Sequence, residues 1–109
     1  MENTTIAASQ ALCLPELIDY VDGAIVSKEI IKKQSGTVTL FAFSAGQGLS
    51  EHSAPFEVLV QVLEGTGTLI IGGQEIEAGS GQTVLMPANV PHSVRADMKF
   101  KALLVMLKK

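Results

Sequence analysis

Several residue types are scarce in this sequence, and each shortage excludes a class of protein. The chain has 109 residues, with no Trp, only 5% aromatic residues and a net charge of −3. It therefore lacks the basic field and the stacking side chains with which proteins hold nucleic acid. No apolar run approaches the ~20 residues that a membrane-spanning helix needs. We expect neither a nucleic-acid partner nor a membrane partner.

Cysteine is nearly absent as well. Cys13 is the only one, so the chain cannot form an internal disulfide. Its place between two leucines predicts a small buried side chain rather than a reactive thiol. An isolated thiol is typical of a reducing compartment, and the N-terminus lacks the basic and apolar regions of a signal peptide. We therefore expect a cytoplasmic protein.

Apolar residues, in contrast, are abundant. They make up 47% of the chain, while charged residues make up 17%. This proportion excludes an intrinsically disordered chain, and the length suits a single core. Pro15 near its start and Gly23 just beyond its end predict a short helix over about residues 15–21. We expect an N-terminal extension over 1–23 that carries this helix, followed by one β-barrel domain over 24–109.

Beyond residue 24 the pattern is that of short strands. Thr37–Ser44 alternates between two kinds of side chain, which is the period of a strand, and Gly72 with Gly73 is a two-residue hairpin signal. Closely spaced glycine-rich turns are typical of an antiparallel sandwich or barrel rather than of alternating βαβ units. The expected strands are Ala24–Ile31, Thr37–Ser44, Phe56–Leu63, Thr66–Ile71, Glu75–Glu77, Thr83–Met86, His92–Ala96 and Lys99–Leu107.

The segment Val58–Leu63 differs from the other expected strands. It is apolar on both of its faces except at Gln61. In a sheet with one solvent-exposed face, apolar and polar residues would alternate along the strand. Both faces of this strand should therefore be buried against other parts of the protein. The barrel interior covers one face, and the N-terminal segment or a second subunit covers the other. Because so short a chain has so many apolar residues, we expect a homodimer.

Two segments resemble the two motifs of the cupin superfamily. The second motif consists of a glycine, five residues, Pro-x-Gly, two residues and a histidine, and Gly81, Pro87 and His92 have this spacing. The first motif contains His-x-His, then Glu, six residues and Gly. His52 and Gly65 match its first histidine and its glycine. The resemblance implies an all-β fold, the double-stranded β-helix or jelly-roll barrel of RmlC-like cupins.

The resemblance covers about residues 36–107 and also implies a place for a metal. In cupins a divalent ion, such as Fe, Mn, Ni or Zn, is usually held inside the barrel by three first-motif side chains and the second-motif histidine. Carried over by position, His52 and His92 are retained, whereas Ala54 and Val58 replace the other histidine and the glutamate. Two of four ligands remain, and a first-row metal normally takes at least three from the protein.

Glu57 and Gln61 are the candidates to complete a metal site. Simple alternation puts both on the face of their strand opposite Val58, away from the barrel interior. A bulge over residues 54–56 would turn Glu57 inward, because one inserted residue reverses the side chains that follow. Gln61 is also compatible with a buried amide or with an interface contact.

These residues leave three functions open. In the first, the barrel binds a small, partly apolar molecule whose polar part contacts His52 and His92, since losing two ligands makes the interior more apolar. In the second, the protein is a metal-dependent oxidoreductase of the dioxygenase kind, or an isomerase, by fold analogy. In the third, it is a structural or regulatory module that acts through its dimer surface. Without a metal, His92 is the best candidate for an acid or base.

Overall fold

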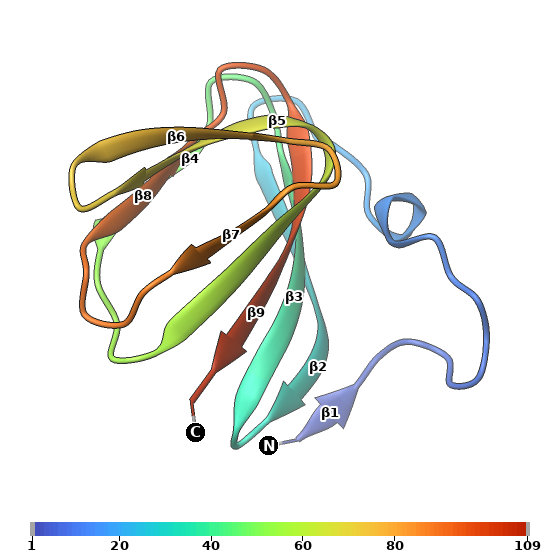
Figure 1. Cartoon of the computed structure of the whole chain (residues 1–109). Coiled ribbons are helices and arrows are strands. Elements are labelled where there is room, and N and C mark those ends of the chain that lie inside the picture. The colour runs from blue at the N-terminus through green and yellow to red at the C-terminus, as the bar shows by residue number, and fades with distance from the viewer. Residues whose placement is uncertain (1, 109) are drawn as a thin grey trace.

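The computed structural model describes residues 2–108 of the chain, and Figure 1 shows an all-β barrel as expected. No helix among the described residues is long and apolar enough to cross a membrane. The elements in chain order are β1 (Asn3–Thr4), the 3-10 helix η1 (Leu14–Leu17), β2 (Ile25–Lys33), β3 (Gly36–Phe43), β4 (Gly48–His52), β5 (Glu57–Ile71), β6 (Gln74–Gly79), β7 (Thr83–Met86), β8 (His92–Arg95) and β9 (Phe100–Leu107).

Two antiparallel sheets form the walls of the jelly roll, and they share β5. The first sheet has the order β1-β2-β3-β9-β5-β7, and the second has the order β6-β5-β8-β4. The early part of β5 pairs with β7 and β9, and its later part pairs with β6 and β8. Figure 1 shows the two walls meeting at the bend of β5. This strand therefore turns the corner between the sheets.

The continuity of β5 corrects the expectation of two strands separated at Gly65. A bulge falls between Val62 and Glu64, and Gly65 has a φ of +76°. A side chain at Gly65 would place its Cβ 2.6 Å from the carbonyl oxygen of Lys99, which directly precedes β9. Glycine here lets the strand bend through a conformation that other residues rarely adopt. The hydrogen-bonded pairing of β5 with its neighbours therefore continues past Gly65.

The inward face of β5 fills the barrel, as its alternation predicts. Val58, Val60 and Val62 are all buried. Farther along the interior, the rings of Phe43 and Phe100 stack with centroids 4.7 Å apart. Because large aromatic side chains fill this end of the barrel, the space that remains lies toward the other end.

The N-terminal segment covers part of the outer face of the first sheet. Ile18 packs with Leu40 and Ala42 in a second buried cluster, and Leu63 lies against it. Figure 1 shows this segment outside β2 and β3, on the side away from β4 and β8. It covers the outer face of β5 at Leu63, whereas Leu59 remains 40% exposed.

Two local expectations about this segment are wrong. The helix spans only one turn, Leu14–Leu17, and Ile18 is already extended at φ −145°. An extended chain brings Ile18 onto the sheet, and this tertiary contact outweighs the helix signals. Cys13 is exposed rather than buried, because Leu14 and Leu17 are the residues that turn toward the second cluster.

Candidate functional site

A cavity of about 200 Å³ lies between the two sheets, at the end of the barrel that Phe43 and Phe100 do not fill. Its walls are mostly apolar, with two imidazoles and two hydroxyls as the polar groups. Side chains from β3, β5, β7 and β9 face side chains from β4 and β8. The lining residues are Thr37, Thr39, Phe41, Leu49, His52, Ala54, Val58, Met86, His92, Val94, Leu104 and Met106.

A bulge in β4 turns His52 into this cavity. In the pairing of β4 with β8, Leu49 is opposite Val94 and His52 is opposite His92, with an irregularity between the two pairs. Three steps along β4 therefore match two steps along β8. In a regular strand, residues three apart point to opposite faces, so the extra residue is what brings Leu49 and His52 to the same face.

His92 is positioned by the loop that precedes β8. In this loop Asn89 replaces the glycine of the Pro-x-Gly part of the second motif, and it has a φ of +66°. Its backbone N–H donates a 2.7 Å hydrogen bond to the carbonyl oxygen of Ala54. The bond ties the loop before His92 to the loop after His52, so the backbone holds the two histidines together.

The two imidazoles lie edge to face, with centroids 4.5 Å apart and planes at 68°. His52 Nδ1 is 2.9 Å from the Ser50 carbonyl oxygen, and His92 Nδ1 is 3.1 Å from the Val90 carbonyl oxygen. A carbonyl oxygen only accepts, so in the neutral rings we place the proton on Nδ1. Each Nε2 is then a lone-pair acceptor on the ring edge away from the strand, available to the cavity.

The sequence candidates Glu57 and Gln61 do not join the histidines. Glu57 is exposed, Gln61 is half-buried, and neither lines the cavity, whereas Val58 between them does. The suggested bulge at 54–56 therefore does not turn Glu57 inward, and simple alternation along β5 holds. The irregularity lies in β4 instead, where it orients His52.

A divalent metal of the kind held by cupins does not fit these donors. Within residues 2–108, no group of three or more His, Cys, Asp or Glu side chains is placed to hold an ion. Ala54 and Val58 line the cavity at the two replaced positions and offer only methyl groups. Two imidazoles are fewer than the three protein ligands that a first-row metal normally takes, and they supply no negative charge to offset a dication.

Among the cavity residues that the motifs do not single out as site residues, four carry oxygen or sulfur in the side chain. Thr37 and Thr39 face inward because β3 alternates, and their hydroxyls are polar groups opposite the histidines. Met86 and Met106 look like ordinary core residues in the sequence. The strand period alone indicates that Thr37 and Thr39 share a face with Phe41, but it does not say that this face borders a cavity.

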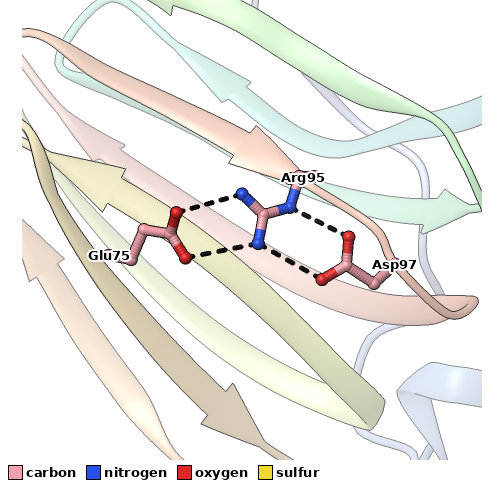
Figure 2. A network of polar contacts seen from close by, with 3 residues as sticks. All are labelled: Glu75, Arg95 and Asp97. Atoms are coloured by element: carbon pink, nitrogen blue, oxygen red, sulfur yellow. Dashed lines mark hydrogen bonds and ion pairs between the residues drawn. The ribbon is translucent and has the colours of Figure 1, made fainter.

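The most extended ion-pair network lies outside the cavity. Figure 2 shows the Arg95 guanidinium between Glu75 of β6 and Asp97, with Nε 2.9 Å from Asp97 Oδ1 and Nη1 3.2 Å from Glu75 Oε2. Hydrogen bonds to Asp97 and Glu75 raise the pKa of Arg95 above its ordinary value. Water screens all three exposed side chains, so the network is a surface feature and not part of the site.

The fold and the histidine pair define a jelly-roll barrel with a small internal cavity. The cupin domain model matches residues 39–107 of the sequence, which is more than half of the chain. The chain therefore belongs to the cupin family. No curated protein matches it.

Solved structures agree with this assignment. A conserved protein of unknown function from Streptococcus pyogenes is 29% identical at a TM-score of 0.90, over 95% of this chain and 91% of that one. A cupin 2 conserved barrel domain protein from Leptotrichia buccalis is 36% identical at a TM-score of 0.84, over 86% of this chain and 46% of that one. A cupin superfamily protein from Desulfitobacterium hafniense, 22% identical at 0.89 over 95% of both chains, shows the same fold.

Proposed function

We propose that the barrel cavity binds a small, largely apolar organic molecule that carries a hydrogen-bond donor. The observation that carries the proposal is the orientation of the two imidazoles. Both Nδ1 atoms face backbone carbonyls, so both Nε2 atoms are left as acceptors beside an apolar space. A hydroxyl or amine proton can be donated to one of these acceptors, and the surrounding side chains contact the apolar part of the molecule.

The size of the cavity sets the size of the ligand. An engineered apolar cavity of about 150 Å³ holds benzene, so a cavity of about 200 Å³ suits a single substituted ring or a short branched chain. A carboxylate would face two lone pairs and would lose its water on entry, which disfavours acids of the same shape. The expected ligand class is therefore small alcohols, phenols and amines.

Matched probes test this proposal. Phenol, toluene and benzoate have similar shapes and differ in the group that would meet the histidines. We expect phenol to bind more tightly than benzoate by ligand-observed NMR. In the variant His92→Leu, the ratio of phenol to toluene affinity should fall by up to about tenfold, the effect of losing one net hydrogen bond.

The control for this experiment is Gln61→Ala, on the outer face of β5, which should leave the ratio unchanged. Using the ratio removes any general effect of a variant on the cavity. A phenol-to-toluene ratio that is the same in His92→Leu and in the original protein would contradict the role of the histidines. Tighter binding of benzoate than of phenol would contradict the proposed ligand class.

A metal-dependent oxidoreductase or isomerase is the weaker alternative for the same cavity. It is supported by His52 and His92 at two ligand positions of the family, and it is opposed by Ala54 and Val58 at the other two. If the protein has a catalytic activity without a metal, His92 is our candidate for a proton acceptor. Its Nδ1 bond orients the ring and leaves Nε2 to receive the proton.

We also propose that two copies of the chain associate through the outer face of the first sheet. Leu59 and Leu85 are cross-strand partners, and Leu59 is also opposite Val105. Leu59, Leu85 and Leu107 are 40%, 50% and 55% exposed. This strip continues the apolar face that the N-terminal segment covers farther along β5, and an isologous pair would bury it against itself.

Light scattering after gel filtration tests the association. The original chain should elute as a dimer at tens of micromolar, and the variant Leu59→Lys with Leu85→Lys should elute as a monomer. Met98, which is 74% exposed elsewhere on the surface, provides the control Met98→Lys, expected to stay dimeric. A monomeric original chain at this concentration would contradict the proposal.

A further inference from the structure

Two methionines occupy the wall of the cavity that faces the histidines. Met86 on β7 and Met106 on β9 are the cross-strand partners of Val58 on either side of β5. Both line the same cavity as His52 and His92. Met86 is 2% exposed and Met106 is half-buried, so both thioethers belong to the interior.

The spacing of the sheets brings these groups within reach of one another. Facing sheets pack about 10 Å apart, and neighbouring strands lie about 4.8 Å apart. A methionine from one sheet and an imidazole from the other each span roughly half of the distance between the sheets. Methionine also has three rotatable bonds and adapts to irregular space. The two thioethers therefore border the same space as the two imidazoles, and rotation of the methionine side chains would bring the sulfurs toward the Nε2 atoms.

The chemistry of this donor set is soft and neutral. Two imidazole nitrogens and two thioether sulfurs bring no negative charge, which disfavours a dication in an apolar cavity. Thioethers select cuprous copper, a soft monovalent ion, among the common biological metals. We propose that the cavity binds one Cu(I) ion through Nε2 of His52 and His92 and the thioether sulfurs of Met86 and Met106.

The histidine geometry supports the same conclusion independently of the methionines. Imidazoles that ligate a metal usually donate their other N–H to a carbonyl or carboxylate, which fixes the ring and its tautomer. Both rings have such a bond, from Nδ1 to the carbonyl oxygens of Ser50 and Val90. The ion would occupy the cavity of the proposed function, but the inference does not depend on an organic ligand.

Competition for Cu(I) tests the inference. The full-length protein is titrated without oxygen against a chromophoric Cu(I) chelator, with ascorbate present. Because Cys13 is exposed and its thiol binds Cu(I) as well, all variants carry Cys13→Ser. We expect one equivalent of Cu(I). Replacing both methionines, Met86→Leu with Met106→Leu, should lower the affinity at least tenfold.

Met98→Leu is the matched control, since Met98 is exposed and does not line the cavity; its affinity for Cu(I) should be unchanged. Leucine conserves the methionine volume, and circular dichroism checks that the double variant folds. If it does not fold, each single methionine variant should lower the affinity on its own. No stoichiometric Cu(I) in the Cys13→Ser protein, or an affinity that neither methionine affects, would overturn the inference. The phenol experiment is done without copper, so failure of the proposed organic ligand and failure of the Cu(I) site can be told apart.

Discussion

The direction in which a few polar atoms point decides the chemistry of the cavity. His52 and His92 bond through Nδ1 to backbone carbonyl oxygens two residues earlier in the chain and present Nε2. Ala54 and Val58 add only apolar surface next to them. Cupin cavities usually hold a divalent metal. In this chain Ala54 and Val58 therefore change the expected occupant to a neutral molecule with a hydrogen-bond donor or to a soft monovalent ion.

Val58→Glu tests the effect of these replacements at a single residue. A carboxylate at this position would give the cavity a third donor and the negative charge that it lacks, so we expect the variant to retain one equivalent of Zn²⁺ after equilibrium dialysis. The original chain should retain none. Zinc should also stabilise the variant, by about 2.7 kcal/mol at a concentration 100 times its dissociation constant.

Gln61→Glu is the control, because it adds the same carboxylate to the outer face of the same strand. It should retain no zinc and gain no stability from it. Equal zinc retention by the original chain and by Val58→Glu would show that two histidines suffice, and that the missing carboxylate does not decide which ion the cavity holds.

Two strands are irregular, and each irregularity is needed for the site. The bulge in β4 orients His52, and the bend in β5 joins the two sheets that enclose the cavity. The bend depends on close contact between β5 and β9. A Cβ placed on Gly67 would lie 2.5–2.9 Å from three ring atoms of Phe100, and that ring is buried and stacked on Phe43.

Gly67→Ala should therefore destabilise the fold. A buried ring that must move to admit a methyl group typically costs about 1–3 kcal/mol, which chemical denaturation would measure. Gly79→Ala is the matched control in β6, where the added Cβ would make only ordinary contacts, 3.6 Å from Thr66 Oγ1. If Gly79→Ala lost as much stability as Gly67→Ala, the contact with the Phe100 ring would not explain the effect at Gly67.

A polar cluster fastens the N-terminal segment to the barrel. The hydroxyl of Tyr20 donates a 2.7 Å hydrogen bond to Glu64 Oε2, and Lys101 Nζ donates one of 2.6 Å to the Pro15 carbonyl oxygen. Lys101 Nζ also lies 5.0 Å from the centroid of the Tyr20 ring. Burial of the phenol, and then the bond and charge of Glu64, raise the pKa of Tyr20 above its ordinary value.

Tyr20 is the only tyrosine, so tyrosinate absorbance reports it directly. In the folded protein it should stay protonated at pH values where an unfolded tyrosine, with a pKa of about 10, ionises. Because the folded pKa is the higher one, the stability linked to Tyr20 is complete below pH ~10 and is lost as pH rises toward the folded pKa.

The variant Glu64→Gln provides the comparison, since it removes the negative charge beside the phenol. The pKa of Tyr20 in the folded variant should be lower than in the original chain. Ionisation of the original folded protein at the ordinary tyrosine pKa would contradict the placement of the N-terminal segment on the barrel.

For the whole molecule, local patterns in the sequence predict much of the barrel. Alternation correctly puts Val58, Val60 and Val62 inside, and the hairpin at Gly72 and Gly73 joins β5 to β6, with Ile71 opposite Gln74. The motif spacing also brings His52 and His92 to one site. These features depend on residues close in sequence or on a pattern shared across a family.

The remaining features depend on contacts between distant parts of the chain. The path of β5 past Gly65 is set by β9, and the inward turn of His52 is set by pairing with β8. The one-turn helix and the exposure of Cys13 follow from how the N-terminal segment meets β3. The extra apolar surface is therefore divided between this segment and the exposed strip at Leu59.

The most direct test of the proposed binding site is a ¹⁵N NMR measurement of the two imidazoles. Since His52 and His92 are the only histidines, the spectrum contains two rings. For the neutral rings we predict protons on both Nδ1 atoms and none on Nε2, and an Nε2 shift change in at least one ring when phenol binds. Protonated Nε2 atoms in the neutral rings, or imidazoles that do not respond to bound phenol, would contradict the role of the histidines as acceptors.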